Sequence, residues 1–126
     1  MAGISDIVDI GTKQSEHFEG EHFEYRVAPE KLIAGDPLQT LTQCYTSPCG
    51  QFSTGIWAST PGHWRVNYTE MEYCEILEGV SVIRDEAGAA KELRTGDRFV
   101  IPSGFKGTWE VVESCRKIYV AYEKAA

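Results

Sequence analysis

The stretch "NYTEMEYCEILEG", residues 67–79, carries the side chains in this chain that are best placed to do chemistry. Side chains alternate across a strand, so two sets form, with Glu70, Glu72, Cys74 and Ile76 on one face and Met71, Tyr73, Glu75 and Leu77 on the other. A carboxylate that points into a dry interior can accept a proton or anchor a nitrogen-containing metabolite. The elements around this stretch must therefore decide which face is the inner one.

Composition limits the classes of partner. The 126 residues predict one domain, and 42% hydrophobic residues are enough for a core. A net charge of −7 at pH 7 argues against nucleic acid and against anionic membranes, because both are polyanions. No apolar run approaches the ~18 residues that a membrane span needs. We expect no nucleic-acid partner and no membrane partner.

The cellular compartment is inferred from the first residues and the cysteines. The start "MAGISDIVDIGTKQSE" has neither a basic region nor an apolar region of the kind that signal peptides carry. We expect a cytoplasmic protein whose four cysteines are reduced. No C-x-x-C pair is present, so the cysteines predict neither a zinc knuckle nor a thioredoxin-type redox site.

Short alternating apolar runs separated by Gly and Pro are typical of an all-β protein. The expected strands recur every ~8–12 residues, as in a sandwich or barrel, and they are 52–59, 64–77, 80–86, 98–102, 108–113 and 116–123. We expect a turn at 78–79, a break between the strands 108–113 and 116–123, and one short helical turn in "APEKLIAGD", residues 28–36. Residues 1–50 are more polar, and we interpret them as an N-terminal arm and loops of the same domain. The barrel itself is expected over 51–126.

Two spaced motifs resemble those of the cupin family, G-x5-H-x-H-x3,4-E-x6-G and G-x5-P-x-G-x2-H-x3-N. The first is matched at Gly62, Glu72 and Gly79, and the second at Gly96, Pro102 and Gly104. The resemblance covers about residues 52 to 122. It implies a single cupin (RmlC-like) jelly-roll β-barrel. Between the motif positions, the residues of these segments resemble those of the small single-domain cupins of the (S)-ureidoglycine aminohydrolase-like group, and also those of a cupin of the ethanolamine-utilisation pathway.

The resemblance also shows which metal ligands are missing. In metal-bearing cupins, three histidines and the glutamate converge inside the barrel, and of these only Glu72 remains here. The first two histidines fall on Arg65 and Asn67 under one allowed spacing, or on Val66 and Tyr68 under the other, and the last falls on Gly107. One carboxylate does not hold Zn, Mn or Fe. We predict no tightly bound metal and no other cofactor.

Histidines elsewhere do not replace the missing ligands. His63 could stand in, but it lies where the first motif begins, and we interpret it as an exposed loop residue. His17 and His22 are five residues apart, a spacing that points them to different faces of a helix or strand. We interpret them as surface or arm residues.

If Glu72 points inward, strand parity places Cys74, Ile76, Phe105 and Trp109 inward with it. Tyr119 corresponds to a substrate-contacting tyrosine of the aminohydrolases, whereas the lysine that follows in those enzymes falls on Glu123. We predict that Glu72 is the proton acceptor or anchor, with Arg65 as its counter-ion. The predicted ligand-binding residues are Arg65, Asn67, Trp109 and Tyr119. The alternative is that Arg65 and Glu72 only neutralise each other and Trp109 is core.

Three functions remain open. The first is a barrel that binds a small, polar, nitrogen-containing metabolite without a tightly bound metal, and that either only binds it or also converts it as a hydrolase or isomerase. The second is a metal-dependent aminohydrolase of the ureidoglycine type, and the third is a non-enzymatic sensory or accessory module. The outward face, with Met71, Tyr73 and Leu77, is too apolar to face water. We therefore expect a homodimer in which the N-terminal arm contacts the partner.

Overall fold

The computed structural model of the chain describes residues 2–11 and 21–125. Within these two ranges the chain forms nine strands, one short 3₁₀-helix and no α-helix. The elements are η1 (Ile4–Asp6), β1 (Glu21–Arg26), β2 (Leu32–Gly35), β3 (Leu38–Thr46), β4 (Phe52–Ser59), β5 (Gly62–Asn67), β6 (Met71–Asp85), β7 (Ala90–Arg94), β8 (Arg98–Ile101) and β9 (Lys106–Tyr122). No helix in these ranges is long and apolar enough to cross a membrane. His17 lies outside the described residues.

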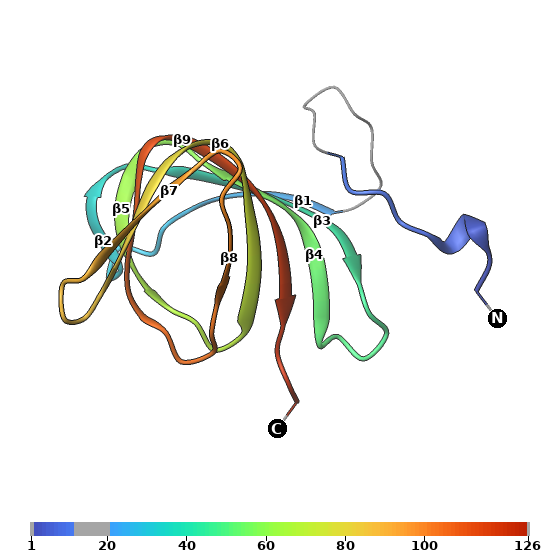
Figure 1. Ribbon diagram of the computed structural model, residues 1–126. Coiled ribbons are helices and arrows are strands. Elements are labelled where there is room, and N and C mark those ends of the chain that lie inside the picture. The colour runs from blue at the N-terminus through green and yellow to red at the C-terminus, as the bar shows by residue number, and fades with distance from the viewer. Residues whose placement is uncertain (1, 12–20, 126) are drawn as a thin grey trace.

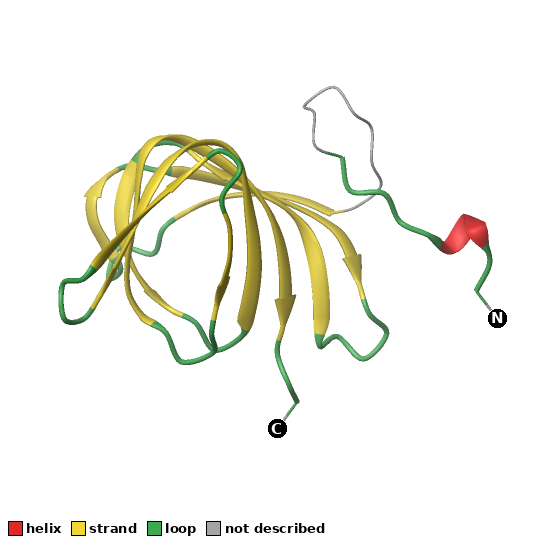
Figure 2. Cartoon of the chain, in the orientation of Figure 1, coloured by secondary structure: helices red, strands yellow, loops and turns green. Residues whose placement is uncertain are grey.

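Strand β9 is the element around which the sheet closes. One edge of β9 pairs with β6, and the other edge pairs first with β5 and then with β4. From β4 the sheet continues through β3 to β1, and from β5 it continues to β2. The second edge of β6 carries β8 and β7. The sheet curls into an open barrel, and the segment that contains η1 extends away from it (Figure 1, Figure 2). The prediction of an all-β barrel is confirmed.

Three of the strands lie within residues 1–50. β1 and β3 pair antiparallel over their full common length, and β3 joins β4 of the main barrel. The predicted helical turn at 28–36 is a single hydrogen-bonded turn, because the amide of Leu32 donates to the carbonyl of Ala28. The chain then continues as β2, not as helix.

The turn predicted at 78–79 is wrong. β6 is continuous from Met71 to Asp85, and its pairing with β9 shifts register between Ile76 and Ser81. Gly79 has φ of 92°, and a Cβ at this position would collide with the backbone carbonyl of Ser114. A glycine in this conformation forms a bulge, which bends the strand without ending it. The break predicted between 113 and 116 likewise lies inside β9.

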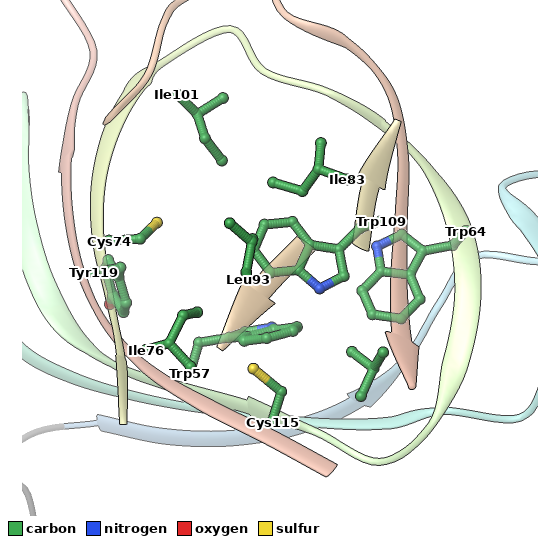
Figure 3. Close-up of a cluster of buried hydrophobic side chains, with 11 residues drawn as sticks. Trp57, Trp64, Cys74, Ile76, Ile83, Leu93, Ile101, Trp109, Cys115 and Tyr119 are labelled. Atoms are coloured by element: carbon green, nitrogen blue, oxygen red, sulfur yellow. The ribbon is translucent and has the colours of Figure 1, made fainter. Parts of the chain in front are cut away.

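The core lies inside the barrel. Burial alternates along β6, where Glu72 and Cys74 are buried while Met71 and Tyr73 are exposed. This confirms the predicted alternation. Figure 3 shows the interior side chains, in which three indoles lie together and Tyr119 lies next to Cys74, its cross-strand neighbour.

Candidate ligand-binding site

A cavity of about 580 Å³ lies within the barrel. This volume is within the ~300–1,000 Å³ that small-molecule pockets usually have. All five residues predicted for the site line this cavity, namely Arg65, Asn67, Glu72, Trp109 and Tyr119. The structure therefore brings them to one place, although they do not all occupy the same depth.

The buried end of the cavity is organised by an ion pair between β6 and β9. The ammonium Nζ of Lys117 donates to Oε1 of Glu72 over 2.7 Å. Both residues are buried, with 4% of Lys117 and 8% of Glu72 exposed. Isolated burial of either charge would cost several kcal/mol, so each charge requires the other.

Two tryptophans complete the surroundings of the ammonium. Nζ of Lys117 lies 4.9 Å from the ring centroid of Trp57 and 4.4 Å from that of Trp109. The two rings meet edge to face, with centroids 5.6 Å apart. The negative face of an indole attracts a cation, most strongly where water is excluded. Lys117 is thus held by one carboxylate and two aromatic faces.

These contacts determine the protonation states. Burial alone would lower the pKa of Lys117, but the neighbouring acidic groups Tyr68, Cys74 and Glu72 raise that pKa above its ordinary value. Burial raises the pKa of Cys74 from 9.0 to about 12. At neutral pH the lysine is therefore an ammonium and the cysteine a thiol. The Cys74 thiol donates to the same Oε1 of Glu72 over 3.2 Å.

Tyr119 supplies a polar atom that nothing in the described structure satisfies. Its hydroxyl is buried, and among the described residues it makes no hydrogen bond. Burial raises the pKa of Tyr119 to about 12, so the phenol is neutral. A buried hydroxyl without a partner costs free energy. This cost would be removed by a ligand that hydrogen-bonds to it.

The expected pairing of Arg65 with Glu72 is wrong, because Lys117 is the counter-ion. Along β5 the inward positions are Trp64 and Val66, so Arg65 and Asn67 are exposed on the alternate positions. Both still line the cavity, where it meets solvent. Glu72, Trp109 and Tyr119 are buried.

The sequence-based prediction missed Lys117 and Trp57. A signal for the lysine was present, because Lys117 lies two residues before Tyr119 on the same strand and must share its face. No comparable signal indicated that Trp57 would lie under the ammonium. That contact depends on how β4 pairs with β9, where Trp57 faces Lys117.

A divalent metal does not fit this site. Among the described residues, no three His, Cys, Asp or Glu side chains lie close enough together to hold an ion. Val66 and Tyr68 pack against the core, and a Cβ at position 107 would collide with the carbonyl of Arg84. The Lys117 ammonium beside Glu72 would also repel a metal ion. The predicted absence of a tightly bound metal stays a prediction.

The remaining histidines lie elsewhere. His63 was expected in an exposed loop, but it lies within β5 and is half-buried, and its Nε2 has no partner among the described residues. It does not line the cavity. His22 is exposed on β1, as expected, and its Nδ1 lies 3.0 Å from the hydroxyl of Thr42.

Comparisons with solved structures agree with the fold. A protein of unknown function of the DUF861 family from Pseudomonas syringae pv. tomato superposes with a TM-score of 0.75 at 19% identity, over 89% of this chain and 46% of that protein. The EutQ protein of Clostridium difficile gives 0.62 at 21%, over 68% of this chain and 63% of that protein. A DUF861 family protein from Thermotoga maritima is 33% identical over 51% of this chain and 73% of its own, with a TM-score of 0.50.

The chain spans less than half the length of the Pseudomonas protein and 63% of the Clostridium protein. A comparison with curated proteins found no match. The family described as the EutQ-like cupin domain matches residues 46–119, which is more than half of the chain. The cupin jelly roll expected from the two motifs is thereby confirmed, and the chain belongs to the family of EutQ-like cupin domains.

Proposed function

We propose that this cupin domain binds a small, polar, nitrogen-containing metabolite in the barrel without a tightly bound metal. The observation that carries the proposal is the buried polar end of the cavity. There, Glu72 is held by Lys117 and Cys74, and the Tyr119 hydroxyl has no partner among the described residues. A few polar groups placed beside apolar and aromatic side chains at the buried end of a pocket are typical of ligand sites.

Glu72 offers the ligand one oxygen. Oε1 accepts from both Lys117 and Cys74, whereas no hydrogen bond to Oε2 is found among the described residues. An N–H group of the ligand would donate to Oε2, and the Tyr119 hydroxyl would donate to or accept from a neighbouring ligand atom. If the bound metabolite is converted, Oε2 is the group placed to take its proton.

The first experiment asks what the protein holds. Native mass spectrometry of the purified chain should show a bound small molecule, or a metabolite panel should raise the melting temperature for at least one class of nitrogen-containing compound. The Tyr119→Phe variant should weaken binding of that compound by about 10-fold, the usual worth of one buried hydrogen bond. The matched control is Tyr73→Phe, on the outward face of β6.

Tyr119→Phe is preferred to Glu72→Gln as a test. Removing the Glu72 charge leaves Lys117 buried without its counter-ion, so the fold and the site would fail together. Removing an unpartnered hydroxyl has no such cost. The proposal is contradicted if Tyr119→Phe and Tyr73→Phe bind the compound equally well.

The aminohydrolase-type function, in which a metal activates water, has less support because the ligand positions are occupied by Val66, Tyr68 and Gly107. Elemental analysis that finds close to one Mn, Zn or Fe per chain would favour it. A sensory or accessory role would be favoured if a compound binds but is never converted. In each case we expect the protein to act in the cytoplasm with reduced thiols.

A further inference from the structure

The charges at the buried end of the cavity are balanced before any ligand enters. Seven charged residues line it, and they are Arg26, Lys31, Arg65, Glu70, Glu72, Lys117 and Glu123. Of these, only Glu72 and Lys117 are buried. One carboxylate and one ammonium at 2.7 Å give the buried end a net charge of zero.

Lys117 is not available to bind an anion from solution. Its ammonium donates to Glu72, and it lies over the rings of both Trp57 and Trp109. These three contacts surround the nitrogen, and only 4% of the residue is exposed. The lysine therefore behaves as a fixed internal cation and not as a binding group.

The groups left for a ligand are uncharged or already neutralised. They include Oε2 of Glu72, which can only accept, the Tyr119 hydroxyl, which can donate or accept, and the side-chain amide of the buried Gln39. Glu72 faces Ala121 across the sheet and Tyr119 lies two residues before it, so the two side chains are diagonal neighbours on one face. A ligand group reaching both must present an N–H or O–H donor together with a second polar atom.

We propose that Lys117 is the permanent counter-ion of Glu72, in the role that a bound cation would otherwise have, and that it restricts the cavity to ligands whose buried end is an uncharged donor–acceptor group such as a primary carboxamide. This inference rests on the proposed function and narrows its ligand class. A ligand ammonium or a metal ion would add a second positive charge beside Lys117. That charge would have no partner in the buried end, where an unpaired charge costs several kcal/mol.

The counter-ion role is tested by chemical rescue. Lys117→Ala removes the part of the side chain that corresponds to propylammonium. We expect propylammonium chloride to raise the melting temperature of Lys117→Ala, and the uncharged 1-propanol to raise it less or not at all. Arg116→Ala, on the opposite face of the same strand, is the matched control and should respond to neither compound. Equal rescue by 1-propanol would show that Lys117 contributes packing and not charge.

A second variant covers the case in which Lys117→Ala does not fold. The double variant Glu72→Gln with Lys117→Met removes both charges and keeps both side chains near their original size. We expect the melting temperature of the double variant to be well above that of the single variant Lys117→Met. If the double variant melts no higher than Lys117→Met, the two charges do not depend on each other and the proposal fails.

The ligand class is tested with two probes of similar size, acetamide and methylammonium chloride. Binding is followed by the NMR signals of the indole N–H groups of Trp57 and Trp109, which line the cavity. We expect acetamide to shift these signals in the wild-type chain and methylammonium to leave them unchanged. In Lys117→Met the buried end carries one net negative charge. The ratio of the dissociation constants of methylammonium and acetamide should therefore fall by about 10-fold or more relative to the wild-type chain.

The outcomes separate the two proposals. Methylammonium binding to the wild-type cavity as tightly as acetamide would overturn the ligand class and leave the proposed binding function standing. If neither probe nor any panel compound shifts the indole signals, the proposed function fails, and the rescue experiment still decides the role of Lys117.

Discussion

Three ion pairs join β6 to β9 among the described residues, and two of them, on opposite faces of the sheet, make a direct comparison. Inside the barrel Lys117 pairs with Glu72 over 2.7 Å, and outside it Arg116 pairs with Glu78 over 2.8 Å. The exposed fractions of the side chains are 5% and 10% for the inner pair, and 17% and 54% for the outer pair. Nearly equal distances thus occur in very different surroundings.

This difference in burial decides how strongly the stability of the fold depends on each ion pair. The outer pair exchanges hydration for a modest attraction, so either partner can be lost at little cost. The inner pair has lost its water, so removing one partner leaves a buried, unpaired charge. The same contrast applies to other groups on these strands, and it predicts which substitutions matter.

The largest expected effect is the loss of the inner cation. Lys117→Met should lower the free energy of unfolding by about 3–5 kcal/mol, because Glu72 stays buried without a partner. Arg116→Met should cost less than about 1 kcal/mol. Urea denaturation followed by circular dichroism measures both. If the free energy of unfolding falls equally in the two variants, the inner ion pair matters no more for stability than the outer one, and the prediction is wrong.

The second effect concerns the outer face, which carries an apolar surface that we call the outer patch. Its exposed residues are neighbours across β8, β6, β9 and β4, and they are Phe52, Met71, Tyr73, Val100 and Tyr122. We propose that a second copy of the chain covers this patch. Sedimentation should then give twice the chain mass of 14.1 kDa.

Tyr73→Glu should raise the dissociation constant of this dimer by about 100-fold or more, because it places a charge at the centre of an apolar contact. Val112→Glu changes another exposed apolar residue, which lies outside the outer patch, and should leave the dimer unchanged. The N-terminal segment, with Ile4 and Ile7 exposed, is the further contact that we expect on the partner. A wild-type monomer at ~10 µM would contradict the proposed dimer.

The third effect is alkaline destabilisation through Cys74. Burial raises the pKa of this thiol from 9.0 to about 12, so the folded state binds the proton more tightly than the unfolded state. The protonated thiol therefore contributes fully to the free energy of unfolding below about pH 9, and this contribution is lost as the pH rises toward 12. At ~1.4 kcal/mol per pKa unit, roughly 2 kcal/mol should be lost between about pH 9 and about pH 10.5.

Cys74→Ser keeps a donor to Glu72 and removes this titration. Denaturation curves of the variant should fall less steeply with pH than those of the wild type over the same interval. Cys49→Ser, which changes an exposed thiol and leaves Cys74 in place, should keep the alkaline fall of the wild type. Parallel curves for the wild type and Cys74→Ser would show that the buried thiol does not titrate as inferred.

The smallest effect is on thiol reactivity outside the barrel. The Ser47 hydroxyl and the amides around Gln51 lower the pKa of Cys49 to about 7. Iodoacetamide at pH 7 should therefore label Cys49 well before Cys74 and Cys115, whose pKa values are raised by burial. Peptide mass spectrometry measures this order. Ser47→Ala should slow the labelling of Cys49 several-fold, and uniform labelling would contradict the assignment.

The sequence predicted the barrel because its signals are local. Alternation along residues 71–77 correctly put Glu72 and Cys74 on one face and Met71 and Tyr73 on the other, and the resemblance to cupins correctly implied that the face of Glu72 is the inner one. Glycine was the less reliable signal, because a positive φ suits both a turn and a bulge. The choice at Gly79 depends on the neighbouring strand, where Ser114 lies against it.

The candidate site was predictable in its residue types and not in its pairing. Strand parity alone places Lys117 on the same face as Tyr119, so the sequence could have predicted an inward-pointing lysine. Arg65 was the more obvious cation because the motif spacing placed it near Glu72. In the structure the alternation of β5 turns Trp64 and Val66 inward, and Arg65 is left exposed.

By itself, the sequence determined an all-β fold and sorted Glu72 and Cys74 onto one strand face, because two-residue alternation acts within single strands. The spaced glycine and proline motifs added the resemblance to cupins, which implied the barrel and made that face the inner one. Only the tertiary structure decided which cation neutralises Glu72. That choice depends on the register between β6 and β9, where Lys117 faces Ile76 and reaches along the strand to the carboxylate. The Tyr119 hydroxyl, which has no hydrogen-bond partner within residues 2–11 and 21–125, was also decided there, because strands distant in sequence close around it.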